Sequence, residues 1–324
     1  MSVSLSIIVP CYNEEQNLNK LWERLNKLKK IFKATYDVEI YPIFVDDGSS
    51  DETHNIIKGF SQRDEHTSFI SFSKNFGKEA AIYAGLEAAI TGDYITIIDA
   101  DLQDPPELLL DMYKMITSEP YDCIATRRTD RKGEPIIRSW FARRFYKIIN
   151  KFSNVEIVDG ARDFRLMTKQ MTESVLQVSE RNRFSKGIFS WVGYKTKWIE
   201  YENLQRNDGS SKWSFFKLTS YAIDGIVAFS TFPLTVAAII GLFFCFLAFA
   251  FIFIIIARTL IFGDPVAGWP STICILLLVS GVQMFCIGVL GIYISKIYSE
   301  TKARPIYIAK DKVIKNKIDG GTHE

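Results

Sequence analysis

Two carboxylates one residue apart follow a short apolar run near the middle of the N-terminal half. The run, residues 94–98, is rich in β-branched and aromatic residues, which is typical of a buried strand. Asp99 and Asp101 follow it, and the amide of Gln103 comes two residues later. These oxygen ligands suit Mg²⁺ or Mn²⁺, which keep several waters and are usually completed by substrate phosphates. A single Asp-x-Asp can also merely solvate a turn, so the surrounding motifs must decide between the two interpretations.

The elements around this acidic pair predict an α/β fold. Apolar segments at residues 5–9, 38–45, 68–72 and 94–98 predict strands, and helical patterns alternate with them. This alternation specifies a doubly wound, mostly parallel sheet with right-handed crossovers. Because the carboxyl ends of parallel strands meet at one edge of the sheet, the polar residues after each strand should converge on a single site there.

Two helix starts are predicted from capping residues. Asn13, with Gln16 three residues later, predicts a helix from there to about residue 32. Asp104 precedes a proline and is followed by Glu107, which predicts an N-cap with its capping-box partner.

The polar strand ends favour a nucleotide-diphosphate-sugar ligand. The first strand is not followed by Gly-x-Gly-x-x-Gly, and no Walker Gly-Lys-Ser/Thr occurs, which argues against a dinucleotide cofactor and a P-loop. Asp46 and Asp47 could accept hydrogen bonds from a base edge or ribose hydroxyls. A metal on Asp99 and Asp101 would neutralise a diphosphate, and Lys78 at a helix start adds positive charge. The residues predicted to bind the nucleotide sugar are Pro10, Tyr12, Asn13, Glu14, Asp46, Asp47, Lys78, Asp99, Ala100 and Asp101.

Composition excludes several other classes. The formal net charge of +2 argues against a nucleic-acid partner. The three histidines are too scattered for a zinc site or a histidine-based triad.

Two C-terminal stretches, about residues 233–257 and 271–294, are each long enough to span a bilayer as a helix. Their connection is nearly neutral, whereas lysines and arginines flank the opposite ends. The positive-inside rule therefore predicts both termini and the catalytic domain in the cytoplasm. We expect a catalytic domain over residues 1–212, a juxtamembrane amphipathic helix over 213–232, a transmembrane hairpin over 233–295, and a cytoplasmic tail over 296–324.

Two basic segments allow two interpretations each. The predicted helix at residues 136–152 mixes aromatic and basic residues, so it could lie on an anionic membrane surface or pack on the sheet. The loop from Arg206 to Lys212 could bind a lipid phosphate or serve as a polar linker.

Several sequence blocks, in order, resemble a known enzyme family. They include Val-Asp-Asp-Gly-Ser-Ser-Asp at residues 45–51, Phe-Ser-Lys-Asn-Phe-Gly-Lys-Glu at 72–79, Asp-Ala-Asp-Leu-Gln-Asp-Pro-Pro at 99–106, and Asp-Phe-Arg-Leu-Met at 163–167. The chain resembles family 2 inverting glycosyltransferases of the GT-A fold. More narrowly it is similar, over nearly its whole length, to the polyprenyl-phosphate glycosyltransferases, such as dolichol-phosphate mannose synthase and bacterial bactoprenol glucosyltransferase.

The resemblance implies transfer of one hexose, glucose by nearest similarity, from a UDP-sugar to undecaprenyl phosphate at a bacterial plasma membrane, for O-antigen modification. It assigns Asp163 as the catalytic base. Since a phosphate dianion needs no base at neutral pH, Asp163 could instead orient Arg165. Asp99, Asp101 and Gln103 would hold Mg²⁺ or Mn²⁺ on the diphosphate. The residues expected at the acceptor phosphate are Arg127, Arg206, Ser211 and Lys212, with Arg165 as a further cation.

Two other classes share part of this pattern. A processive polysaccharide synthase uses the same nucleotide-sugar half, but the chain has no Gln-x-x-Arg-Trp segment and few spans. A lipid-linked sugar flippase would need polar groups inside the membrane, where Gln283 is the only strongly polar residue. Gly281, Gly288 and Gly291 permit close helix contact, so we expect a homo-oligomer. The resemblance further implies a flippase and a second glycosyltransferase that act downstream.

Overall fold

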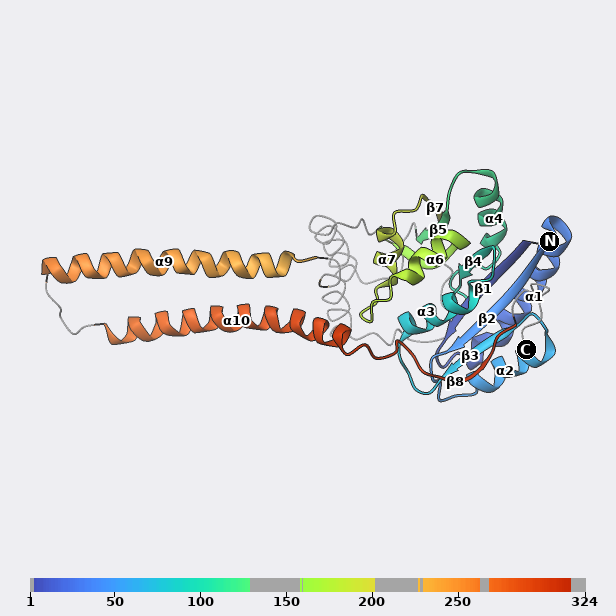
Figure 1. Cartoon of the computed structure of the whole chain (residues 1–324), viewed down its shortest axis with the longest axis horizontal. Coiled ribbons are helices and arrows are strands. Elements are labelled where there is room, and N and C mark those ends of the chain that lie inside the picture. Colours follow the sequence, from blue (N-terminus) through green and yellow to red (C-terminus); the bar gives the residue numbers. More distant parts are fainter. Residues whose placement is uncertain are drawn as a thin grey trace.

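A single mixed sheet organises the α/β part of the molecule (Figure 1). The computed structural model describes residues 3–128, 158, 160–201, 227, 230–262 and 268–315. Among these residues the strand order is β7-β5-β6-β4-β1-β2-β3-β8. The strands are β1 (Val3–Cys11), β2 (Val38–Asp46), β3 (Ser68–Phe72), β4 (Tyr94–Ile97), β5 (Cys123–Arg128), β6 (Ala161–Thr168), β7 (Thr196–Tyr201) and β8 (Ala309–Val313).

The sheet combines a parallel centre with antiparallel additions. Strands β4, β1, β2 and β3 are mutually parallel, as the sequence predicts. Strand β6 runs antiparallel to both β4 and β5, and β8 runs antiparallel to β3. The prediction of a GT-A-like, mostly parallel sheet is confirmed, and its mixed character comes from strands outside the first four.

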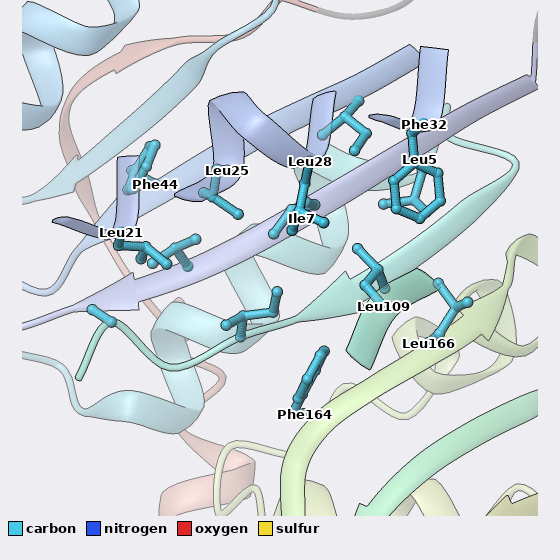
Figure 2. Close-up of a cluster of buried hydrophobic side chains, with 14 of the residues drawn as sticks. Leu5, Ile7, Leu21, Leu25, Leu28, Phe32, Phe44, Leu109, Phe164 and Leu166 are labelled. Carbon is cyan, nitrogen blue, oxygen red and sulfur yellow. The ribbon is translucent and has the colours of Figure 1, made fainter. Parts of the chain in front are cut away.

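Helices cover both faces of this sheet. They are α1 (Glu15–Tyr36), α2 (Thr53–Arg63), α3 (Lys78–Ala89), α4 (Leu108–Ser118), α6 (Lys169–Gln177) and α7 (Ser185–Trp191). One buried cluster joins the sheet to α1, α2 and α4, and the other joins it to α3, α6 and α7. Figure 2 shows the first cluster, with leucines and Phe32 of α1 facing β1.

Strand β1 supplies side chains to both clusters by strict alternation. Leu5, Ile7 and Val9 face α1, whereas Ile8 faces α3. Helix α3 lies very close here, because a Cβ on Gly85 would come within 2.2 Å of the Ile8 side chain. Burying each such Leu or Ile contributes about 1.5–3 kcal/mol. This packing holds the carboxyl ends of the central strands in fixed positions.

Both helix-cap predictions are wrong. Helix α1 begins at Glu15 after Glu14, while Asn13 has a left-handed φ of 54°. Its side-chain oxygen accepts the backbone N–H of Ser50 instead. Helix α4 begins at Leu108, and Asp104 is only 1% exposed because its carboxylate turns inward. Tertiary partners displaced the local capping pattern in both cases.

Two long helices project from the α/β domain (Figure 1). They are α9 (Phe232–Phe262) and α10 (Trp269–Thr301), and they contain the ranges predicted to span a membrane. The segments Phe232–Phe251 and Leu278–Thr301 are long and apolar enough to do so, with mean hydropathies of 2.6 and 1.8. A Cβ at Gly281, Gly288 or Gly291 would meet nothing within 4 Å, so these glycines face open space.

After α10 the chain returns to the sheet. Strand β8 pairs with β3, and the ring of Tyr307 stacks on Phe72 at a centroid distance of 4.8 Å. The sheet therefore includes residues from the range 296–324, which the sequence predicts as a cytoplasmic tail. The predicted helix at 136–152, the loop from Arg206 to Lys212 with Ser211, and nearly all of 213–232 lie outside the described residues.

Candidate active site

One lysine joins two carboxylates at the carboxyl edge of the parallel strands. The antiparallel register places Arg165 of β6 opposite Ile97 of β4, so Asp163 comes opposite Asp99 just past the last pair. Lys78, the first residue of α3, lies between them. Its Nζ is 2.7 Å from Asp99 Oδ1 and 2.5 Å from Asp163 Oδ2. Predicted site residues from three separate segments thus form one cluster.

The charges of this cluster stabilise one another. Burial alone would raise the pKa of Asp163, but Lys78, Lys186 and Arg165 outweigh it and hold that pKa well below its usual range. Burial alone would lower the pKa of Lys78, but Asp163 and Asp99 raise it well above its ordinary value. Asp163 is therefore an anion, and Lys78 a cation, throughout the neutral pH range.

The acidic loop that follows β4 is tightly folded. Leu102 has a φ of 58°, an uncommon conformation for a bulky residue, and such residues cluster at functional turns. This turn brings the Gln103 backbone N–H to Asp101 Oδ1 at 3.1 Å. The Gln103 side-chain oxygen accepts from Arg162 Nη2 at 2.9 Å. Ala100 is only 3% exposed and belongs to the buried cluster that joins the sheet to α1, α2 and α4.

The donor set of this loop fits a hard divalent cation. Asp99, Asp101 and Gln103 offer carboxylate and amide oxygens, the ligand type that Mg²⁺ and Mn²⁺ prefer. Within the described ranges, no group of three or more His, Cys, Asp or Glu residues could hold a metal. Asp99, Asp101 and Gln103 would supply part of the shell of such a cation, and substrate phosphates and water would complete it.

Asp46 is committed to its own loop. It is 1% exposed, with Oδ1 accepting the Ser49 N–H at 2.9 Å and Oδ2 accepting from Ser71 Oγ at 2.7 Å. These bonds fix the turn after β2. Its predicted contact with a base or ribose stays a prediction.

Asp47 ties the β2 turn to the loop before α3. Its carboxylate accepts the backbone N–H groups of Phe76 at 2.7 Å and Gly77 at 2.9 Å. Burial outweighs these bonds and raises the pKa of Asp47 to about 6. The next residue, Gly48, has a φ of +66°, and a Cβ there would lie 2.4 Å from the carbonyl carbon of Lys74. Only glycine fits so close an approach of two site loops.

The end of β1 supplies the remaining predicted donor-site residues. Pro10 is buried in the strand, whereas Tyr12 is 49% exposed. The backbone N–H of Asn13 donates to Ser49 Oγ at 3.0 Å, which links this loop to the β2 turn. Glu14 is the N-cap residue that directly precedes α1.

The cations predicted for an acceptor phosphate lie in different surroundings. Arg165 is 3% exposed, and its guanidinium lies 3.7 Å from the ring centre of Phe189. This buried position favours a role for Arg165 as a supporting charge behind Asp163 over direct contact with an acceptor phosphate. Arg127 on β5 is half-exposed and pairs with Glu200 of β7. Arg206, Ser211 and Lys212 lie outside the described residues.

Sequence reasoning missed several charged residues around the cluster. Lys186 Nζ donates to the Ala161 carbonyl at 2.9 Å, and its charge helps to lower the pKa of Asp163. Glu79 accepts the backbone N–H of Ser185 at 2.9 Å and so links α3 to α7. Lys186 begins a further block of the family resemblance, Lys-Gly-Ile-Phe-Ser-Trp-Val-Gly at residues 186–193, which is a usable signal, but nothing local marks Glu79 as a partner of α7.

Comparison with known proteins shows the family to which the chain belongs. The family described as Glycosyl transferase family 2 matches residues 6–176. The chain belongs to this family, and it is a glycosyltransferase with a GT-A-like mixed sheet.

Full-length relatives extend the similarity into the C-terminal helices. CsbB of Bacillus subtilis (strain 168) is 42% identical over 321 residues, which cover 99% of this chain and 95% of the relative. The bactoprenol glucosyl transferase of Shigella phage SfX is 40% identical over 310 residues, covering 96% of this chain and all (100%) of that protein. The prophage bactoprenol glucosyl transferase homolog of Escherichia coli (strain K12) is 41% identical over 308 residues, covering 95% of this chain and 99% of the relative.

A solved structure with a similar arrangement is glucosyl-3-phosphoglycerate synthase from Mycobacterium tuberculosis, in complex with Mn²⁺, UDP-glucose and phosphoglyceric acid. It has a TM-score of 0.44 and 16% identity, covering 70% of this chain and 78% of that chain.

Proposed function

We propose that the protein transfers a single hexose, glucose in our assignment, from a UDP-sugar to undecaprenyl phosphate with inversion. The observation that carries the proposal is the cluster in which Lys78 joins the Asp99 loop to Asp163. Glucose and the lipid acceptor are supported by relatives named bactoprenol glucosyl transferase that match almost end to end.

On the donor side, the acidic loop would hold the diphosphate of the nucleotide sugar. Asp99, Asp101 and Gln103 would bind Mg²⁺ or Mn²⁺, which stabilises the negative charge of a departing nucleoside diphosphate. Lys78 adds a fixed positive charge beside the same loop. Preorganised charge of this kind is commonly the largest contribution to catalysis.

On the acceptor side, the nucleophile already carries its charge. An oxygen of the lipid phosphate forms the new bond to the anomeric carbon. At the same time the bond from that carbon to the diphosphate breaks, and the diphosphate oxygen keeps the electron pair. Attack from the opposite face gives inversion. Because Asp163 is held as an anion and the acceptor needs no deprotonation, we assign Asp163 to orienting Lys78 and the sugar, with a role as base as the alternative.

The acceptor must approach against the charge of the donor diphosphate. Lys78, Lys186 and Arg165 surround Asp163 and would reduce that repulsion. Arg127 and the segment containing Arg206, Ser211 and Lys212 are the further groups that we assign to the lipid phosphate.

We place the catalytic domain at the cytoplasmic face of a bacterial plasma membrane, with α9 and α10 spanning it. Their length and apolar composition support this arrangement. The basic residues Lys296, Lys302 and Arg304 at the domain end of α10 support the orientation. A homo-oligomer, a flippase and a second glycosyltransferase remain the partners that we expect.

A product assay tests the proposal. Membranes containing the protein are incubated with undecaprenyl phosphate, Mg²⁺ and a panel of labelled nucleotide sugars. The expected product is a lipid that carries one sugar and is labile in mild acid, formed fastest from UDP-glucose and abolished by EDTA. Polymer would instead indicate a processive synthase, and sugar-lipid transport without synthesis would indicate a flippase.

A further inference from the structure

The two segments that carry the site lose their pairing with each other before they reach it, although β6 stays in the sheet as far as Ala161 through its pairing with β5. The last recorded pair between β4 and β6 joins Ile97 to Arg165. Asp99, Asp101 and Gln103 all lie beyond that pair on one segment, and Asp163 lies beyond it on the other. Side-chain contacts must therefore keep the acidic loop and Asp163 in a fixed relation.

Arg162, the neighbour of Asp163, supplies such contacts on the side away from Lys78. Its Nη2 donates to the side-chain oxygen of Gln103 at 2.9 Å, and its Nε lies 3.4 Å from Asp104 Oδ1. Its carbonyl oxygen accepts from Arg165 Nη2 at 3.0 Å. Arg162 therefore contacts both the acidic loop and the strand β6, which carries Asp163.

A buried acid and a tyrosine hold Arg162 in place. The Asp104 side chain is 1% exposed and that of Arg162 is 17% exposed. Each charge therefore needs the other to offset its loss of solvation. The hydroxyl of Tyr201, at the end of β7, donates to Asp104 Oδ1. These three side chains link β7, β6 and the acidic loop.

We propose that Arg162, Asp104 and Tyr201 are positioning residues that hold the Gln103 side chain, and with it the acidic loop, in register with Asp163. None of the three is assigned contact with substrate. The inference rests on the proposed function, because it gives Gln103 and its loop the task of holding the metal and the diphosphate.

Removing a single hydroxyl tests this idea with little change in packing. Tyr201→Phe keeps the ring and removes the donor to Asp104. Tyr194→Phe is the matched control, because its hydroxyl bonds Ser174 Oγ at 2.8 Å in a separate part of the domain. Arg162→Lys is a second variant that keeps the charge but loses the forked contact with both Gln103 and Asp104. The full chain in nanodiscs is titrated with Mn²⁺ in the presence of UDP, and free Mn²⁺ is measured by electron paramagnetic resonance.

The expected result is a Kd for Mn²⁺ about tenfold weaker in Tyr201→Phe and in Arg162→Lys than in the wild type. Tyr194→Phe should bind like the wild type, and the two phenylalanine variants should have similar thermal unfolding midpoints. Unchanged Mn²⁺ binding in Tyr201→Phe, or equal weakening in Tyr194→Phe, overturns the positioning role and leaves the proposed function intact. A wild type that binds no Mn²⁺ with UDP contradicts both.

Discussion

At the residue scale, the site depends on an ammonium shared between two carboxylates. Lys78 lies within hydrogen-bond distance of both Asp99 and Asp163, which come from strands that pair side by side. Their residue types could be predicted from the sequence, because each stands at the end of a predicted strand or in a family block. Their direct contact could not, since it depends on the antiparallel strand β6 inserted beside β4.

Replacing Lys78 by methionine removes this shared charge. We expect turnover to fall about 100-fold, a loss comparable to that of one fixed donor in other sites. The pKa of Asp163, now depressed chiefly by Lys78, should also rise, so the variant should lose activity as pH falls where the wild type does not. Turnover measured from pH 5 to 8 checks both effects. Lys33→Met on the surface of α1 is the control, and a Lys78→Met profile that matches it would contradict the assignment.

The raised pKa of Asp47 predicts a second pH effect, on stability. The folded-state pKa of about 6 exceeds the value of 3.8 expected for an exposed Asp, so the folded protein retains a proton that the unfolded chain has lost. This contribution is present below pH 3.8 and is lost as pH rises through about 6, with a total of about 3 kcal/mol.

Asp47→Asn should remove that dependence. The free energy of unfolding of the wild type, relative to Asp47→Asn, should decrease from pH 4 to pH 6.5 and then remain constant. Denaturant unfolding of the purified protein at several pH values measures the difference. A difference that does not vary with pH would show that the Asp47 carboxylate titrates normally.

At the element scale, the parallel core follows from the sequence and the antiparallel additions do not. The four central strands are short, apolar and separated by helical patterns, so local rules suffice to find them. The two N-cap predictions are wrong because contacts distant in sequence decide these positions. Asn13 bonds Ser50 and Asp104 bonds Tyr201. Strand β8 is similar, because it finds its partner β3 only after the chain has passed through α9 and α10.

Strand β8 should be necessary for a stable sheet. It covers the edge of β3, which would otherwise present unpaired backbone groups, and it brings Tyr307 onto Phe72. A chain ending at residue 305 should lose about 2–4 kcal/mol of stability and aggregate more readily. A chain ending at residue 315, which retains β8, is the control. Equal denaturation midpoints for the two truncations would show that β8 contributes nothing.

At the scale of the whole molecule, α10 is joined to the domain near the active site. Glu300 accepts the backbone N–H groups of Arg181 at 2.8 Å and Asn182 at 3.0 Å, just before α7. Lys296 Nζ also donates to the Asn182 side chain at 2.8 Å. The apolar helices themselves could be predicted from hydropathy, but this docking joins residues more than a hundred positions apart and has no local signal.

Loosening this contact should affect the lipid substrate more than the soluble one. In Glu300→Ala, two backbone N–H groups lose their acceptor, which should cost about 1–2 kcal/mol of stability. We expect a several-fold higher KM for undecaprenyl phosphate and little change in KM for UDP-glucose, because the position of α10 relative to α7 is disturbed. Ser299→Ala, whose hydroxyl donates to the Ser295 carbonyl within α10, is the control. Equal changes in both KM values would contradict this separation.

The most direct test of the account is to locate the cation with the donor product bound. Crystals of the full chain grown with Mn²⁺ and UDP would be measured for anomalous scattering at the manganese edge. We predict one strong peak beside the carboxylates of Asp99 and Asp101, in contact with the diphosphate and on the same side as Lys78. A peak elsewhere, or a bound diphosphate with Asp99 and Asp101 turned away from it, would contradict the mechanism.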